Sequence, residues 1–446
     1  MDAAPTDEQR FPLLNPTGRR MLRRLREHPH RPRYNFQTDD RLTEEGLARV
    51  RAYAARLRTE RVGWRPGGLP PWVPPFVAFC RREVPFYRRQ LDWPDEIAGL
   101  PTTDREDLRR EPWAFVPDSA DLTGLIVYTT TGTTGNRLKI LSHPEVSSRY
   151  LPMMETALEA HGVRLEGGER VSIINVCAQK QTYVFASVSS LLDGAGFVKV
   201  NLNPDDWNDP DDRVRFLDDC DPELYTGDPF SFSELMKLPL RTRPKALISA
   251  ATTLLPGLWR RLESHFGCPV LDIYSANESG PVAFARGGDH EILPPDLYVE
   301  VLDSEGRPCP PGSRGEIALT GGNNPYLPLL RYRTADHAAL DFSGPLPVLV
   351  GLEGRPPSVF RDAEGRIFNS IDVTIALRDL PLPFFALHQA ADGALVFRTR
   401  CDEATKAAAE QALRTLFGPE PHLTIEMVPE AEPWQGKLIQ YRSDVA

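Results

Sequence analysis

A turn rich in threonine and glycine is the sharpest chemical feature of this sequence. Residues 128–136 read YTTTGTTGN and continue directly from the apolar run 125–128, whose last residue is Tyr128. Glycine allows a backbone to approach a ligand closely, and the N–H groups and hydroxyls of such a turn can surround phosphate oxygens. No Gly-Lys-Ser/Thr sequence closes the turn, so it is not a Walker A loop. The pattern indicates a phosphate-binding loop of another kind, with an ordinary surface turn as the alternative.

A second group of candidate residues follows the apolar run 269–274. The segment LDIYSANESGP (271–281) places Tyr274 at the end of a predicted strand and Glu278 four residues later. An aromatic ring at a strand end can stack on a base, and a carboxylate beside it can hold Mg²⁺. Three more polar segments are PLLRYRTADH (328–337), GLEGR (351–355) and WQGKLIQY (434–441). No GxGxxG, GxSxG or HExxH sequence is present, so dinucleotide, serine-hydrolase and zinc-protease sites lack local support.

In their order and spacing, these segments resemble the adenylate-forming superfamily, which includes acyl-CoA synthetases, peptide-synthetase adenylation domains and luciferases. Two segments ahead of the threonine-rich turn narrow the resemblance. VPFYRRQL (84–91) and LPTTDREDLRREP (100–112) are similar to the phenylacetate-CoA ligase branch. The resemblance extends from about residue 83 to the end of the sequence.

The resemblance implies a nucleotide site made from the threonine-rich turn and the four later segments. The β- and γ-phosphates of ATP would be cradled by Thr130, Thr131, Gly132, Thr133, Thr134 and Gly135. Tyr274 would stack on adenine beside Ser275, and Glu278 would bind Mg²⁺. Asp336 lies in RYRTAD, where the family usually has RYRTGD, and would accept hydrogen bonds from both ribose hydroxyls. Arg355 would reach the ribose or the phosphates.

Lys437 stands at the family's C-terminal catalytic lysine, so the resemblance implies that Lys437 and Glu278 are the catalytic residues. Its ammonium would bridge the substrate carboxylate and the α-phosphate. A carboxylate that attacks a phosphate builds up anionic oxygens, which preorganised donors stabilise. Only seven of the 52 basic residues are lysines, which makes a lysine at this position more notable. The alternative is an ordinary surface lysine.

Three departures from the family pattern concern the loop, the acid site and the hinge. Asn136-Arg137-Leu138 follows the loop where the family has Gly-Lys-Pro, and Ser249-Ala250-Ala251 replaces Gly-Ala-Glu. The predicted hinge between the large domain and the C-terminal lobe reads Gly354-Arg355-Pro356-Pro357-Ser358. Further on, Ala363-Glu364 replaces an Arg-Gly pair of the family. Proline fixes its own φ and restricts the preceding residue. We therefore expect intact adenylation and an unusual second step.

The acid pocket is predicted from the segment that follows VSIINV (171–176). Bulky residues occur there in place of the family's glycines, which reduces the pocket volume and favours a compact aryl acid over a fatty acid. The predicted pocket residues are Gln181, Tyr183, Phe185, Ser249, Ala250 and Ala276. Core packing is the alternative for Tyr183 and Phe185. Lys180 could reach a polar ring substituent, although an exposed position is expected.

These residues together predict an enzyme that uses ATP and Mg²⁺ to adenylate a small aromatic carboxylic acid, releasing pyrophosphate. A nucleophile then attacks the acyl-adenylate. The altered hinge favours a small-molecule hydroxyl or amine as the acceptor, giving an ester or an amide. A conventional aryl-CoA ligase, with CoA as acceptor and a thioester as product, is the alternative. A second alternative is a nucleotide-binding paralogue that has lost catalytic activity.

The elements that must position these residues read as an α/β fold. From residue 125, short apolar runs alternate with longer helical stretches, which is typical of βα units and a parallel sheet covered on both faces. Turn-separated strands between 300 and 350 predict antiparallel pairing. We expect a large N-terminal domain (1–354) with βα units and mixed sheets, and a small, mobile α+β C-terminal lobe (355–446). A helix over Glu403–Phe417 is predicted within that lobe.

Composition excludes several classes of protein. The 446 residues carry a formal charge of -10, which argues against a nucleic-acid or anionic-membrane partner. No 18-residue apolar run occurs, so neither a signal peptide nor a membrane span is expected, and a cytoplasmic location is the default. The six scattered cysteines show no zinc-ligand spacing. The expected partners are a small aryl acid and an acyl acceptor, and a homodimer is compatible with the sequence.

Overall fold

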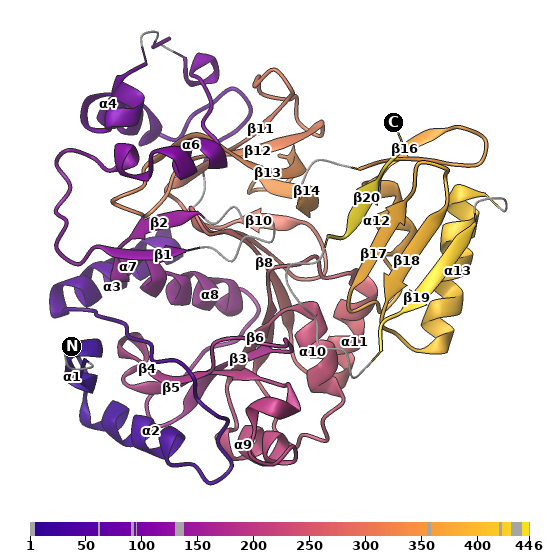
Figure 1. Ribbon diagram of the computed structural model, residues 1–446. Coiled ribbons are helices and arrows are strands. Elements are labelled where there is room, and N and C mark those ends of the chain that lie inside the picture. The colour runs from indigo at the N-terminus through magenta and orange to yellow at the C-terminus, as the bar shows by residue number, and fades with distance from the viewer. Residues whose placement is uncertain are drawn as a thin grey trace.

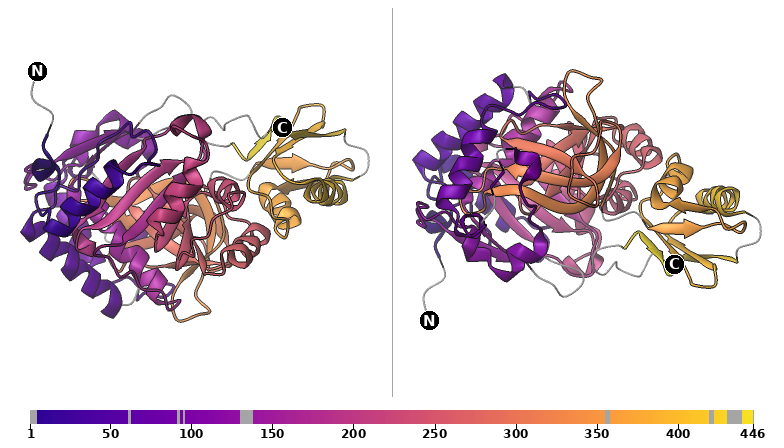
Figure 2. Two further views of the ribbon diagram at one scale, coloured as in Figure 1. Left: turned by 90° about the horizontal axis from the view of Figure 1, so that it is seen from below. Right: turned by 90° about the horizontal axis from the view of Figure 1, so that it is seen from above.

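The computed structural model describes residues 5–60, 63–90, 93–94, 96–129, 138–354, 358–418, 422–429 and 439–445. Within these residues, a twelve-stranded mixed sheet forms the body, and a four-stranded sheet forms the core of the C-terminal lobe (Figure 1). The lobe projects from one side of the body (Figure 2). None of the described helices has the length and apolar character needed to cross a membrane.

One half of the large sheet contains the predicted βα units. Its strand order is β8-β7-β6-β3-β5-β4, and all neighbours are parallel except β4, which pairs antiparallel with β5. The strands are β3 (Val171–Cys177), β4 (Phe185–Ser189), β5 (Ala195–Asn201), β6 (Leu224–Gly227), β7 (Ala246–Ser249) and β8 (Val270–Ala276). Helices pack on both faces of this half, as continuous apolar strands require.

The two faces have separate cores. One is filled by α2 (Pro16–Arg26), α9 (Asp212–Cys220), α10 (Pro229–Met236) and α11 (Pro256–Phe266). The other is filled by α3 (Glu44–Thr59) and α8 (Tyr150–Glu159), with Tyr53 and Leu158 packed on Ile248 and Ile273 of the sheet. Burial of such side chains stabilises the fold by about 1.5–3 kcal/mol each. The predicted α/β class is confirmed.

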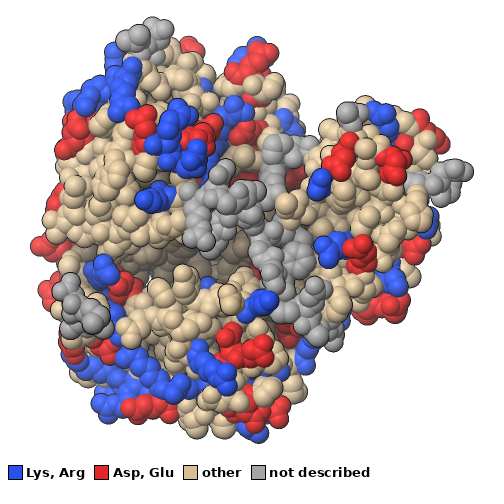
Figure 3. Space-filling view, viewed as in Figure 1, with Lys and Arg blue, Asp and Glu red and all other residues tan. Residues whose placement is uncertain are grey.

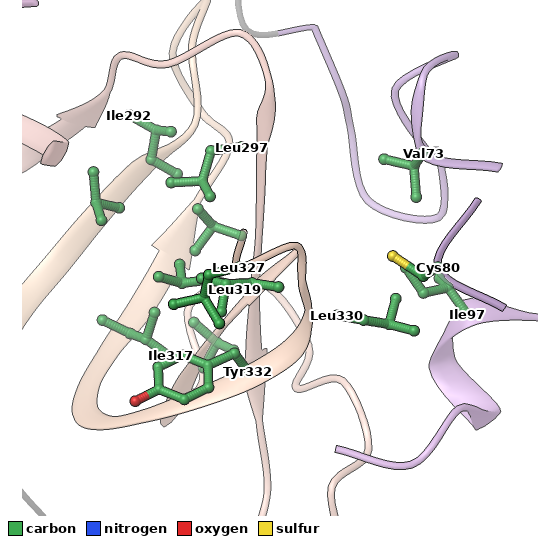
Figure 4. Close-up of a cluster of buried hydrophobic side chains, with 14 of the residues drawn as sticks. Val73, Cys80, Ile97, Ile292, Leu297, Ile317, Leu319, Leu327, Leu330 and Tyr332 are labelled. Carbon is green, nitrogen blue, oxygen red and sulfur yellow. The ribbon is translucent and has the colours of Figure 1, made fainter. Parts of the chain in front are cut away.

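The other half of the sheet is antiparallel, as predicted for residues 300–350. Its strands, in the order β11-β12-β13-β14-β10-β9, are β9 (Gly280–Ala285), β10 (His290–Ile292), β11 (Leu297–Leu302), β12 (Arg314–Gly321), β13 (Leu329–Asp341) and β14 (Val348–Gly354). Figure 4 shows Val73, Cys80 and Ile97, from segments far earlier in the chain, beside Leu330 of β13 in one buried cluster. N-terminal segments therefore cover this half.

The remaining elements of the body are short. They are α1 (Asp7–Arg10), α4 (Val73–Glu83), α5 (Pro85–Arg88), α6 (Arg105–Arg110), α7 (Pro144–Ser148), and the hairpin of β1 (Ile126–Thr129) with β2 (Lys139–Ser142). This hairpin is the stem of the predicted phosphate loop. All six cysteines lie in the described part of the chain and are free.

The C-terminal lobe has its own sheet and core. Its elements are β15 (Val359–Arg361), β16 (Ile367–Asn369), α12 (Ser370–Leu377), β17 (Phe385–Gln389), β18 (Leu395–Thr399), α13 (Glu403–Phe417), β19 (Leu423–Met427) and β20 (Tyr441–Ser443). The predicted helix over Glu403–Phe417 is confirmed as α13. Val373, Leu413 and Phe417 pack in a cluster with the sheet. The domain boundary at residue 354 stays a prediction, because residues 355–357 lie outside the described part.

Polar contacts join residues of the body to residues of the C-terminal lobe. The buried Glu353 carboxylate at the end of β14 accepts hydrogen bonds from Ser370 Oγ at 3.0 Å and Thr374 Oγ1 at 3.1 Å, both on α12. The Thr374 hydroxyl lies 2.5 Å from the hydroxyl of Tyr441 in β20. On α11, Arg260 pairs with Asp379 at 2.7 Å. The lobe is therefore held against the body by directional bonds.

Strand β13 departs from a regular strand at two residues. Arg331 and Ala335 have φ values of 47° and 65°, in the left-handed region that disfavours side chains. Arg331 is 1% exposed, and its guanidinium pairs with the buried Glu300 at 3.2 Å and donates to three backbone carbonyls. Burial raises the pKa of Glu300, while Arg331 opposes that shift. The strand is thus anchored by one buried ion pair.

We predict that Arg331→Leu destabilises the protein by about 3–5 kcal/mol, because the Glu300 carboxylate would be left buried without its partner. A large fall in the apparent midpoint of thermal unfolding would report it. Arg56→Leu, which removes an exposed pair with Glu60, is the matched control and should change the midpoint little. Equal midpoints for the two variants would contradict the structural role of Arg331.

We predict that Ala335→Gly stabilises the protein by about 1 kcal/mol, because glycine adopts a positive φ without steric cost. Ala338→Gly on the same strand is the control. Ala338 is fully buried and has no positive φ, so its substitution should destabilise. Thermal unfolding of both variants distinguishes the two effects, and a loss of stability on Ala335→Gly would be the contrary result.

Candidate active site

A hydrogen bond between Tyr274 and Asp336 joins two of the predicted nucleotide residues. Tyr274 is buried at the end of β8, and its hydroxyl donates to Asp336 Oδ2 at 2.9 Å. Burial, and then the Asp336 carboxylate, raise the pKa of Tyr274 well above its ordinary value, so the phenol stays protonated and donates. Thr334 Oγ1 accepts from the Asp336 N–H at 3.1 Å and further fixes this carboxylate. Residues 62 positions apart in sequence therefore form one rigid unit.

Glu278 is the second centre of the site. Its side chain is buried, and Arg105 Nη1 donates to its carboxylate at 3.0 Å. Three tyrosines surround it: Tyr128, Tyr150 and Tyr332. Burial is the first cause that raises the pKa of each phenol, that of Tyr150 to about 12, and the Glu278 charge adds to the shift in all three. Glu278 is thus a carboxylate held among neutral phenols, with the Arg105 guanidinium as an ion-pair partner.

The stem of the predicted phosphate loop reaches the same place. Tyr128, in β1, donates a hydrogen bond from its hydroxyl to the carbonyl of Asn277 at 2.9 Å. Thr103 pairs with Tyr332 of β13, and the Arg333 N–H donates to the Thr103 carbonyl at 2.7 Å. Because α6 begins at Arg105, this pairing sets Arg105 opposite Glu278. The segments 271–281 and 328–337 therefore meet, as the resemblance implies for a nucleotide site, and segment 100–112 joins them at Glu278.

The carboxylate of Glu278 fits a metal ion that arrives with a nucleotide. Among the described residues, no group of three or more His, Cys, Asp or Glu side chains could hold an ion alone. Mg²⁺ commonly takes one or two carboxylates and completes its shell with phosphate oxygens and water. Glu278 can supply one such oxygen if Arg105 shares the carboxylate.

Several predicted site residues lie outside the described part of the chain. They are Thr130, Thr131, Gly132, Thr133, Thr134, Gly135, Arg355 and Lys437. Asn136, Arg137, Pro356 and Pro357, which carry the departures from the family pattern, lie outside it as well. Their roles stay predictions. Ser275 is described and is exposed beside Tyr274.

The predicted acid-pocket residues lie at the carboxyl ends of the parallel strands. Ser249 is buried at the end of β7, and no partner for its hydroxyl is found among the described residues. Ala250 and Ala276 are half-buried. Ala251, where the family has glutamate, has a φ of 74°. The ends of β7 and β8, two neighbouring parallel strands, thus supply these residues at one edge of the sheet.

The loop after β3 supplies the other predicted pocket residues. Gln181 is exposed, and Tyr183 is 60% exposed, so Tyr183 is not a core residue. Phe185 is half-buried and packs on Phe36, with ring centroids 6.0 Å apart. The Tyr183 ring lies 4.5 Å from the Phe36 ring. Figure 3 shows the surface hollowed between the region of β1 and β2 and the region of β3 and β4.

Sequence reasoning missed Arg105, Tyr128 and Phe36 as neighbours of these residues. Arg105 lies within LPTTDREDLRREP, a segment whose resemblance indicated only the phenylacetate-CoA ligase branch. Tyr128 is the first residue of the threonine-rich segment, in which only the threonines and glycines were predicted to bind phosphate. Phe36 precedes every recognised motif, so no pattern pointed to it.

Comparison with known proteins agrees with this geometry. Residues 105–324 match the family model described as AMP-binding enzyme. The phenylacetate-coenzyme A ligase of Aromatoleum evansii is 23% identical over 309 residues, and that of Thermus thermophilus is 26% identical over 302 residues. These alignments cover 63% and 60% of this chain, and 65% and 63% of the relatives, slightly less than two thirds of their length.

A solved structure has the same fold over most of the chain. It is described as a 2-hydroxyisobutyryl-CoA ligase in the postadenylation state in complex with 2-HIB-AMP. It has a TM-score of 0.61 and 18% identity, and the match covers 89% of this chain and 90% of that one. Family match, relatives and fold agree, and the chain is similar to AMP-binding enzymes and to the phenylacetate-coenzyme A ligases.

Proposed function

We propose that this protein is an ATP-dependent ligase that adenylates a small aryl acid and then transfers the acyl group to a nucleophile. The observation that carries the proposal is the meeting of three side chains in one site: Tyr274 bonds to Asp336, and the Glu278 charge acts on Tyr274. In an adenylating enzyme, these side chains would contact the base, the ribose and the phosphate end of ATP. The names of the relatives, which are acid–CoA ligases, support the same reaction class.

The chemistry requires charge neutralisation around the phosphates. The acid carboxylate attacks the α-phosphorus, the bond to pyrophosphate breaks, and pyrophosphate leaves with its negative charge. Mg²⁺, when bound with ATP, would supply part of that neutralisation, and Glu278 would hold it. Asp336 would fix the ribose, and Tyr274 orients the Asp336 carboxylate by donating to it. Lys437 would contribute a cation at the carboxylate and α-phosphate, where donors of this kind act on developing charge.

CoA is the acceptor that the relatives' names favour, and an aryl-CoA thioester is the corresponding product. One observation favours a second candidate, a small-molecule hydroxyl or amine. Pro356 and Pro357 follow directly after Arg355, at the hinge where the family lobe rotates between the two steps. Two prolines restrict backbone rotation there. Bonds from Glu353 to α12 add a further restraint on the lobe.

The proposal predicts acid-dependent formation of aryl-adenylate from ATP. Purified protein is incubated with Mg²⁺-ATP and a panel of benzoates, hydroxybenzoates and fatty acids, with and without CoA, and products are identified by mass spectrometry. Aryl-AMP and pyrophosphate should form, and octanoate should be a poor substrate. Stoichiometric aryl-CoA in the presence of CoA would select the thioester and reject the ester or amide. Absence of adenylate with every acid would refute the proposed function.

Lys437→Ala serves as the chemical control for this experiment. We expect it to lower ATP–pyrophosphate exchange by about 10²- to 10³-fold, the usual effect of removing one preorganised donor. Lys406→Ala, at an exposed i,i+3 pair with Glu403 in α13 of the same lobe, should leave exchange unchanged. Unaltered exchange in Lys437→Ala would show that this lysine does not act in adenylation.

Asp336→Asn tests the nucleotide half of the site. Loss of the carboxylate should weaken binding of both ATP and AMP by about 10- to 100-fold, because charge-assisted hydrogen bonds to the ribose would be lost. Isothermal titration calorimetry with each nucleotide measures this change. Asp341→Asn, at the other end of β13, is the control, since the Asp341 side chain accepts hydrogen bonds from the nearby Ser343. Normal nucleotide affinity in Asp336→Asn would remove Asp336 from the site.

A further inference from the structure

A polar row crosses the otherwise apolar parallel strands near their carboxyl ends. Asn175 of β3 lies directly opposite Lys199 of β5 on one side and Thr226 of β6 on the other. Side chains opposite each other on neighbouring strands share one face of the sheet. The Asn175 Nδ2 group donates to Thr226 Oγ1 at 2.9 Å, which joins two members of the row. The apolar run VSIINV is thus interrupted at the residue that faces Lys199.

The row lies on the face that continues toward the predicted acid pocket. Thr226 is opposite Ile248 of β7, and Ile248 packs in one cluster with the predicted pocket residue Ala250. At the other end, Lys199 is opposite Phe185, a predicted pocket residue in β4. The Phe185 ring packs on Phe197, which lies two residues before Lys199 on the same face, with centroids 5.8 Å apart. An aromatic surface and a polar row therefore adjoin each other on this face.

Lys199 differs from the other described lysines in its surroundings. Carboxylates pair with Lys237, Lys245 and Lys406. Lys139 and Lys180 are exposed. Lys199 is half-buried, and the described residues contain no carboxylate in an ion pair with it.

The ammonium of Lys199 acts on the carboxyl end of β3. Burial raises the pKa of the Cys177 thiol, and Lys199 opposes this shift, so its charge is felt beside that strand end. A half-buried ammonium without a carboxylate partner loses hydration that a ligand oxygen can replace. Asn175 can add a second polar contact, since within the described ranges its Oδ1 receives only a long contact from the Cys177 thiol, at 3.7 Å.

We propose that the row determines substrate choice by binding a polar substituent, a hydroxyl or second carboxylate, on the ring of the aryl acid. Lys199 is the specificity-determining cation, and Asn175 and Thr226 complete the polar contact. The ring itself lies on the aromatic surface that includes Phe185. The inference rests on the proposed adenylation of an aryl acid and extends it by naming the substrate class. It also assigns to Lys199 the contact with a polar ring substituent that the sequence alone suggested for Lys180.

The test compares acids in pairs with and without the substituent. ATP–pyrophosphate exchange is measured for benzoate, hydroxybenzoates and benzene dicarboxylates in the wild-type protein, Lys199→Met and Lys180→Met. In the wild type, the best substituted acid should exceed benzoate in kcat/KM by at least about tenfold. Lys199→Met should lower kcat/KM for that acid by about 10- to 100-fold, through KM, and leave benzoate and the KM of ATP unchanged. Lys180→Met, the exposed neighbour in the β3–β4 loop, should behave as wild type.

Each outcome has a defined meaning. Equal use of substituted acids and benzoate by the wild type, or an unchanged preference in Lys199→Met, would overturn the inference and leave adenylation intact. An equal loss for benzoate and substituted acids would assign Lys199 a structural role and overturn it too. Lys199→Arg should restore part of the preference and, with Lys199→Gln, replaces the methionine variant if that variant does not fold. No exchange with any acid in the wild type would overturn both proposals.

Discussion

The hydrogen bond between the Tyr274 hydroxyl and the Asp336 carboxylate connects the two halves of the large sheet at the point where the site forms. Tyr274 lies near the end of β8, the last parallel strand, and Asp336 lies in the long antiparallel strand β13. The bond constrains both residues, because a buried phenol without an acceptor would cost about 1–3 kcal/mol. The carboxylate gains an orientation that solvent would not give it. The base-side and ribose-side residues are therefore positioned relative to each other before any ligand binds.

That bond depends in turn on the irregular backbone of β13. Arg331 is buried with Glu300, and Ala335 has a positive φ directly before Asp336. A strand that alternated regularly through 331–336 would direct its side chains to alternate faces in strict order. The two left-handed residues interrupt this order and coincide with shifts in the β12–β13 register. Strain of this kind persists only where the surrounding structure over-determines it, and the buried ion pair supplies that constraint.

Sequence reasoning predicted the class of the fold because its evidence was local. Apolar strands between helices, the helix Glu403–Phe417 and the antiparallel region near 300–350 follow from composition and periodicity within short windows. It also predicted that segments 271–281 and 328–337 share a site, through resemblance. It missed Arg105, Asn175 and Lys199, because each depends on a strand pairing or loop path that periodicity does not encode. Lys180 and Lys199 look alike in sequence, and only register and burial distinguish them.

Lysine is scarce in this chain, and the proposals place one lysine at each end of the substrate. The guanidinium of arginine is a bulky, planar group with several donors. The ammonium of lysine is a compact charge that suits a single oxygen in a confined space. Arginine dominates the surface ion pairs of this protein, as in the pairs of Arg56, Arg58 and Arg170. Lys437 and Lys199 are the lysines to which the proposals give a ligand, one at the reacting carboxylate and one at the far substituent. A ring held between two such contacts would have one orientation, so the length of the acid, as well as its polarity, would decide whether its carboxylate reaches the α-phosphate.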